Sequence, residues 1–170
     1  MVTKRHFIAA LIIFFAVPLF FNSARSASFE EEATLFVERI ADKAIKLLTD
    51  ETISRDERNQ RFKTYFNNHF AVAGIGEWIL GRYWRKATEK EREEYLVLFE
   101  DMMVFFLVDR FTNYVGEPLQ IHKSLVQDEK NITIFSETHQ KNGEPPIRID
   151  WRVARKDDFI KIVDVVIEGT

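Results

Sequence analysis

An aspartate lies among apolar residues near the C-terminus, where a carboxylate could act as a general base. Asp164 stands in the run 160–167, in which most of the other side chains are isoleucine or valine. Burial among such side chains raises the pKa of a carboxyl group and suits it to accept a proton from a substrate. The opposing interpretation is a carboxylate paired with an arginine or with backbone donors, because buried charges are normally paired. Asp150 belongs to the outward face of its own segment.

Other kinds of chemistry find little support in the residue types. The sequence contains no phosphate-binding glycine loop, no G-x-S-x-G elbow and no H-E-x-x-H pair. It has no cysteine, which excludes a thiol nucleophile and a thiolate metal site. His69, His122 and His139 stand at separations that match no local metal-ligand spacing. We therefore predict no catalytic residue, no metal and no cofactor.

A surplus of large apolar side chains is the stronger signal. From Tyr95 to Val108 only Glu100 and Asp101 are polar, so a helix here is apolar on most of its circumference. Such a helix is expected to lie centrally in the fold. Its aromatic and methionine surface is explained either by ordinary core packing or by an internal cavity that holds an apolar ligand.

Helices are predicted for the first part of the chain that follows the N-terminal segment. Apolar residues recur there at intervals of three and four. Ser54 with Glu57, and Thr88 with Glu91, have the spacing of capping boxes and so predict two helix starts. The four predicted helices cover residues 28–50, 54–69, 72–80 and 88–114.

The pattern then changes to short segments rich in β-branched and aromatic residues, separated by turn-forming residues. The predicted strands cover residues 119–126, 132–139, 147–154 and 159–167. Short connections favour an antiparallel meander of four strands. Helices followed by strands predict an α+β fold, with the helices, including the long central one, packed on one face of the sheet and enclosing an apolar cavity.

The N-terminus has the pattern of a secretory signal peptide. A basic start precedes an apolar stretch over 7–21, and Ala24 and Ser26 suit the positions before a cleavage site. The apolar stretch is shorter than the ~20 residues that a membrane-spanning helix needs. We predict a signal peptide over 1–26 and a single mature domain over 27–170, with a cut one residue further on as the near alternative.

Charge argues against a nucleic-acid partner. Lysine and arginine number 24 against 27 for aspartate and glutamate, and the net charge is −3. Such a chain has no strongly basic surface with which to neutralise a phosphate backbone. Removing the predicted signal peptide takes away three basic residues and makes the mature chain more acidic still.

Three segments carry a resemblance to a known family. Residues 80–88 (LGRYWRKAT), followed by Glu91, Tyr95 and Phe99, lead into the predicted long helix. Residues 110–117 (RFTNYVGE) end that helix, and residues 160–169 (IKIVDVVIEG) form the last strand. These segments resemble the MlaC family, also called the toluene-tolerance auxiliary proteins, whose patterns are L-G-x-x-W-x-x-A-[ST] and W-K-I-x-D-V-x-V-E-G.

The chain departs from the family pattern at two places. Phe159 and Ile160 stand where the family usually has a tryptophan. Family members also continue into a C-terminal helical segment beyond the position of Thr170. If that segment forms part of the pocket wall, the chain is expected to be either a truncated product or a variant with a more open pocket.

The resemblance implies a periplasmic carrier rather than an enzyme. Such a carrier holds phospholipid acyl chains between helices and sheet. It shuttles lipid between an outer-membrane lipoprotein complex and an inner-membrane ATP-binding-cassette (ABC) transporter complex. Periodicity and resemblance together assign the pocket lining to Trp84, Phe99, Met102, Met103, Phe106, Ile134, Trp151, Val153, Ile162 and Val165. Arg82 and Arg85 are candidates for its mouth or for a docking surface.

Physical chemistry sets the demand on such a carrier. Burying one methylene is worth ~0.8 kcal/mol, so two chains of about sixteen carbons represent on the order of 25 kcal/mol of apolar surface. A carrier must therefore enclose most of both chains. The alternatives are a hopanoid-type lipid carrier, a small cone-shaped α+β enzyme with Asp164 as base, and a structural adaptor without a ligand.

Overall fold

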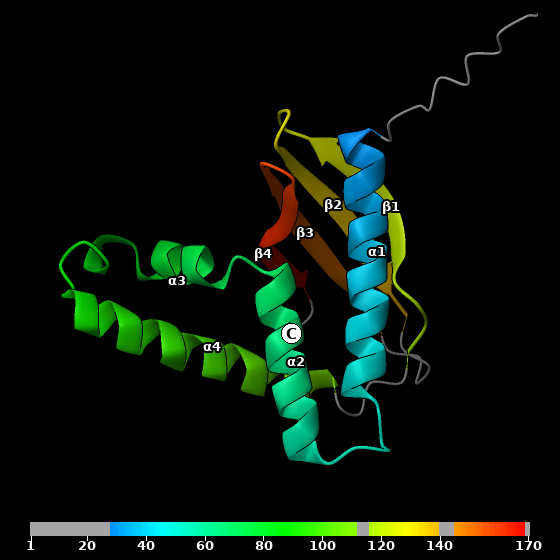
Figure 1. Ribbon diagram of the computed structural model, residues 1–170. Helices are drawn as coiled ribbons and strands as arrows, with labels where there is room; N and C mark the ends of the chain where they lie inside the picture. The colour runs from blue at the N-terminus through cyan, green and yellow to red at the C-terminus, as the bar shows by residue number, and fades with distance from the viewer. Residues whose placement is uncertain (1–27, 112–115, 140–144, 169–170) are drawn as a thin grey trace, which may run out of the picture.

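The computed structural model describes residues 28–111, 116–139 and 145–168 (Figure 1). Four α-helices precede a four-stranded antiparallel sheet whose strand order is β1-β2-β3-β4. The α+β class and the meander are thus confirmed. The predicted signal peptide and the last residues of the predicted fourth helix, 112–114, lie outside the described residues.

Helix α1 (Phe29–Leu48) covers one face of the sheet. The Ser28 hydroxyl accepts a hydrogen bond from the backbone N–H of Glu31, whose carboxylate accepts one in return from the backbone N–H of Ser28. This capping box satisfies donors that the first helical turn leaves free. The buried stripe of α1, which includes Val37 and Ile40, packs against the sheet and forms the first of two apolar clusters.

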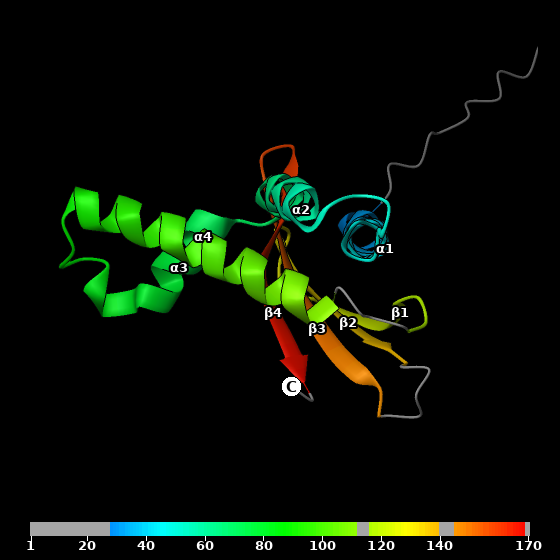
Figure 2. The ribbon, with the colours of Figure 1, turned by 90° about the horizontal axis from the view of Figure 1, so that it is seen from below.

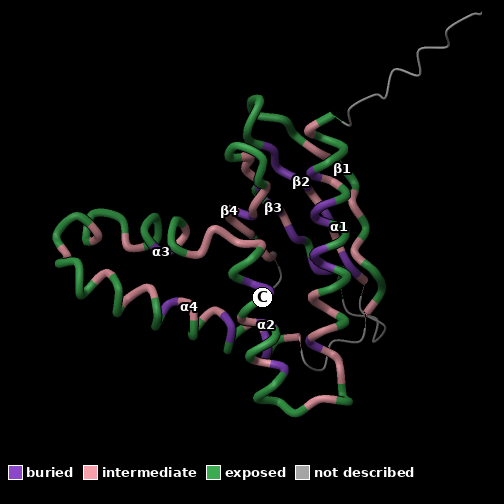
Figure 3. Tube along the Cα trace, in the orientation of Figure 1, coloured by how far each residue is buried: buried purple, intermediate pink, exposed green. Residues whose placement is uncertain are grey.

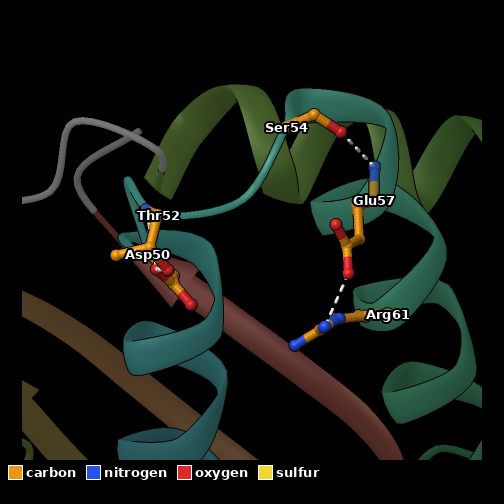
Figure 4. A network of polar contacts seen from close by, with 5 residues as sticks. All are labelled: Asp50, Thr52, Ser54, Glu57 and Arg61. Atoms are coloured by element: carbon orange, nitrogen blue, oxygen red, sulfur yellow. Dashed lines mark hydrogen bonds and ion pairs between the residues drawn. The ribbon is translucent and has the colours of Figure 1, made fainter.

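A short polar connection links α1 to α2 (Arg55–His69) (Figure 4). The Asp50 carboxylate accepts hydrogen bonds from the backbone N–H and the hydroxyl of Thr52, at 2.9 Å and 2.5 Å. These bonds lower the pKa of Asp50. Ser54 accepts a bond from the backbone N–H of Glu57 at 3.2 Å, as predicted, but the Glu57 carboxylate binds Arg61 at 2.5 Å. The structure thus shows one of the two bonds of this predicted capping box.

The sheet consists of β1 (Gln120–Val126), β2 (Asn131–Thr138), β3 (Ile147–Lys156) and β4 (Phe159–Glu168). Its register sets Ile134 opposite Trp151, and Trp151 opposite Val165. These three residues form one row across three strands, and partners in register share a face of an antiparallel sheet. Ile134 and Trp151 belong to the buried cluster that α1 covers, and Val165 packs against it.

Helices α3 (Val72–Leu80) and α4 (Glu89–Phe111), with the 3₁₀ turn η1 (Gly81–Tyr83), form an arm that extends away from the sheet (Figures 1 and 2). The two helices lie side by side. A Cβ atom at Gly76 would stand only 2.9 Å from a methyl group of Leu96, so glycine permits the close approach. The Tyr95 hydroxyl donates a hydrogen bond to the Gly76 carbonyl at 3.0 Å.

The position of α4 differs from the prediction of a central helix. Only its C-terminal half is anchored, because Val104 and Val108 join Leu48, Phe62 and Phe66 in the second apolar cluster. Leu98, Met102 and Phe105 are exposed, and much of the arm lies in solvent (Figure 3). An apolar circumference therefore does not place this helix at the centre, because no other element of the described chain covers its outer face.

Candidate functional site

A groove of about 730 Å³ lies between the sheet, helices α1 and α2, and the arm. Its volume falls in the range of roughly 300–1,000 Å³ that is typical of small-molecule sites. Most side chains that line it are aliphatic or aromatic. Exposed charged residues, among them Glu38, Asp42 and Lys46 of α1, lie along its margin. The groove therefore combines an apolar interior with a charged edge.

The sheet forms one wall of the groove through Ile149, Trp151, Val165 and Ile167. The indole N–H of Trp151 donates a hydrogen bond to the Ser136 hydroxyl at 3.0 Å, and that hydroxyl donates to the Ile149 carbonyl at 2.7 Å. Both polar groups are satisfied within the sheet. Trp151 can thus contribute its ring to an apolar wall without an unpaired donor.

Helices α1 and α2 form the second wall. Ala41 and Ala44 leave room along α1, while Phe62 and Phe66 of α2 face the groove. Tyr65 also lines it, and its hydroxyl donates to the Ile40 carbonyl at 3.1 Å. Burial raises the pKa of Tyr65 to about 12, so this side chain is neutral at ordinary pH. The Tyr65 hydroxyl therefore adds no charge to this wall.

The third wall belongs to the arm. Ile75 and Ile79 of α3 and Phe99, Met103 and Phe106 of α4 line the groove. Phe99 is buried, whereas Phe106 is 51% exposed and Ile79 is 55% exposed. This side of the groove is therefore the more open one, as expected for a wall that stands away from the sheet.

The ten side chains predicted to line a pocket divide into three groups. Five line the groove: Phe99, Met103, Phe106, Trp151 and Val165. Three are fully buried in the first apolar cluster: Ile134, Val153 and Ile162. Two lie on the arm outside the groove: Trp84, whose ring meets Tyr95 edge-on at 6.5 Å, and Met102, which is 57% exposed.

The contribution of α1 and α2 to the groove was not predicted from the sequence. Small residues such as Ala41 and Ala44 fit the amphipathic stripe of α1, so periodicity assigns them to core packing. Phe62 and Phe66 share a face of α2, and their spacing alone predicts only that this face is apolar. Two alanines on α1 facing two phenylalanines on α2 are the feature of the sequence that could have indicated a space between these helices.

Asp164 lies at the groove and is paired. Its carboxylate stands 3.3 Å from the Arg152 guanidinium on the neighbouring strand β3. This is the arginine pairing that the alternative interpretation of Asp164 expects.

Two of the histidines meet a shared carboxylate. His122 and His139 lie 3.2 Å and 3.7 Å from an oxygen of Glu137. His69 is elsewhere, on α2, where its Nδ1 stands 2.7 Å from the Tyr65 carbonyl. In the described part of the chain no group of three or more histidine, aspartate or glutamate side chains could hold a metal ion.

Arg82 and Arg85 are placed at the outer end of the arm and do not line the groove. Ile79, one turn before Arg82, does line it. The two arginines therefore belong to a surface next to the groove. Over residues 28–111, 116–139 and 145–168, no helix has the length and apolar character needed to cross a bilayer.

Two comparisons connect this geometry with known proteins. The MlaC protein family model matches residues 38–170. The fold is similar to that of a phospholipid-binding protein from Ralstonia solanacearum, solved in complex with a phospholipid. The TM-score is 0.66 at 17% sequence identity, and the match covers 81% of this chain and 79% of the other. A likeness at that identity establishes a shared fold.

Proposed function

The chain belongs to the MlaC family, and on that premise we propose that it is a lipid carrier whose groove holds the acyl chains of a phospholipid. The observation that carries the proposal is the apolar groove of about 730 Å³ between sheet and helices. The R. solanacearum protein of the same fold binds a phospholipid. Acyl chains are the apolar ligand that such a groove suits.

Contact with the apolar walls supplies binding energy of the kind that a carrier needs. Each methylene moved from water into contact with side chains such as Phe99, Met103 and Trp151 contributes ~0.8 kcal/mol. The headgroup remains at the charged margin in solvent, where its phosphate keeps its hydration and requires no dedicated basic residue. Of the ten residues assigned from the sequence, we propose that the five in the groove contact lipid.

The carrier acts in the periplasm as a single mature domain over 27–170, after removal of the signal peptide. It exchanges phospholipid with an outer-membrane lipoprotein complex and an inner-membrane ABC transporter complex. Family membership supports this assignment. A carrier works by differential affinity, so that contacts with a partner favour a state that releases the lipid. It requires no catalytic group.

Native mass spectrometry of the mature protein purified from the periplasm tests the proposal, followed by extraction and identification of the lipid. We expect one diacyl phospholipid per chain. A protein that is empty as purified and also fails to take up added phospholipid would contradict the carrier function.

The Asp164→Asn variant separates the carrier from the enzyme alternative. Asparagine keeps the size of the side chain and removes its charge, so we expect lipid occupancy within about twofold of the original protein, a difference below ~0.5 kcal/mol. Occupancy is measured by the same extraction. Arg152→Gln is the matched control, because it removes the other half of the ion pair. A product formed from the bound lipid by the original protein, and absent with Asp164→Asn, would show an enzyme instead.

A further inference from the structure

The outer end of the arm exposes aromatic and aliphatic side chains that no described element covers. We call residues 78–90 the arm tip; it includes the connection between α3 and α4 at the end of the arm far from the sheet (Figure 1). Trp78 is 73% exposed and Tyr83 is 54% exposed. Large exposed apolar residues gathered in one place mark an interaction surface.

The arm tip also gathers positive charge. Residues 78–90 contain four cations and one carboxylate, Glu89, for a net charge of +3, and the acidic residues Glu77, Glu91, Glu93 and Glu94 flank them along α3 and α4. The cations are Arg82, Arg85, Lys86 and Lys90. Within the described residues none of these four forms an ion pair with a carboxylate, although carboxylates outnumber cations in the chain. Their charge is therefore available to an anionic partner.

Hydrogen bonds and ring contacts fix the shape of the arm tip. The Arg82 guanidinium lies 5.0 Å from the centre of the Tyr83 ring and donates to its hydroxyl at 3.1 Å. At its C-terminal side the Thr88 hydroxyl and the Glu91 carboxylate form a complete capping box. Arg92 donates to the Trp84 carbonyl at 2.8 Å. A preorganised surface loses little conformational freedom when it binds.

We propose that the arm tip docks on the surface of bilayers that contain anionic phospholipids. Tryptophan and tyrosine suit the interface between headgroups and acyl chains, and lysine and arginine are attracted to anionic headgroups. The arm tip presents both kinds of residue on one protruding end. The acidic remainder of the chain is repelled by the same surface, which leaves the arm tip as the part that approaches it.

The position of the groove gives this docking a use. Ile79 belongs to the arm tip and also lines the groove, so the arm tip borders the groove at this residue. Lipid then has a path along the arm, from a docked bilayer at its end to the groove at its base. This use depends on the proposed function, whereas docking itself does not.

Co-sedimentation with vesicles tests the inference. The vesicles contain phosphatidylcholine alone or with about one third phosphatidylglycerol, a mixture that carries an anionic surface potential. We expect the protein to bind the anionic vesicles, and the binding to weaken as added salt screens the charges. The Arg85→Gln/Lys86→Gln variant is expected to lower partitioning by about tenfold, and Trp78→Ser by a similar factor.

The matched control is Lys130→Gln/Lys156→Gln, which removes the same charge from exposed positions near the hairpin turns of the sheet. It is expected to bind like the original protein. Equal binding by both double variants, or equal binding to neutral and anionic vesicles, would overturn the inference. So would sedimentation velocity showing that the protein dimerises through the arm tip and does not bind vesicles.

Lipid extraction from the Arg85→Gln/Lys86→Gln variant distinguishes docking at the arm tip from lipid binding in the groove. A variant that is loaded with lipid but does not bind vesicles supports docking at the arm tip and leaves the groove assignment intact. A protein that binds anionic vesicles through the arm tip but carries no lipid would contradict the proposed function alone.

Discussion

Replacing Ala44 with tryptophan is expected to weaken phospholipid binding in the groove. Ala44 lines the groove from α1 and packs against both apolar clusters. An indole ring at this position takes the place of about two to three methylenes, each worth ~0.8 kcal/mol, which lowers lipid affinity by about 10- to 100-fold. The measurement is the ratio of extracted phospholipid to protein, followed by titration of the delipidated protein with a fluorescent phospholipid.

Leu35→Trp is the control for this prediction. It introduces the same side chain on the same helix, at a residue that is 59% exposed and does not line the groove. Its lipid occupancy is expected to equal that of the original protein. Circular dichroism and cooperative urea unfolding of both variants establish that α1 remains folded. If folded Ala44→Trp retains full occupancy, the acyl chains do not lie between α1 and the arm.

Replacing Phe66 with alanine is expected to destabilise the fold by about 3–5 kcal/mol. Phe66 is 2% exposed and belongs to the cluster that anchors α4. Its ring centre lies 4.4 Å from that of Phe70 and 6.2 Å from that of Phe62. Losing these contacts leaves a cavity where three elements meet. Urea denaturation of the delipidated protein measures the free energy of unfolding.

Phe106→Ala provides the comparison. Phe106 also lines the groove, but half of its surface is exposed in the absence of lipid. Its removal is expected to cost less than about 1 kcal/mol of folding free energy and to weaken lipid binding. Equal losses of stability in the two variants would show that the Phe106 side of α4 is covered in solution, although it is half exposed in the structure.

Helix starts were predictable from the sequence because capping is a local interaction. Thr88 and Glu91 form the two reciprocal bonds that their spacing predicts. Ser54 also caps its helix, but Glu57 had a competing partner four residues further on, Arg61. The antiparallel meander was also predictable, because the alternation of apolar and polar residues and the short turns between strands are local patterns too.

The position of α4 could not be predicted from its composition. Periodicity reports which side chains of a helix are apolar, whereas coverage depends on which other elements reach it. Val104 and Val108 are covered by α1 and α2, while Leu98 and Met102 have the same character and are exposed. The difference arises from the direction in which the arm leaves α2.

Only part of the groove lining was predictable, because the sequence pattern does not show where packed side chains leave a space. Trp151 and Val165 lie on the α1-facing side of the sheet, and alternation together with the family resemblance assigned them to the pocket. Ile134 and Val153 share that pattern but are fully buried in the first apolar cluster, where no space remains. The alternation of apolar and polar residues along a strand distinguishes the buried face from the exposed face. It does not distinguish a packed interior from a groove.

Fluorescence quenching of Trp151 by brominated acyl chains is the most direct test of the central claim. The chain has three tryptophans, and Trp78→Phe/Trp84→Phe leaves only the one that lines the groove. A phospholipid with bromine atoms midway along its chains is loaded, and its stoichiometry is determined by extraction. The account predicts strong quenching of Trp151 relative to the same protein loaded with unbrominated lipid. Unchanged fluorescence at one bound lipid per chain would contradict it, because the acyl chains would then lie outside the groove.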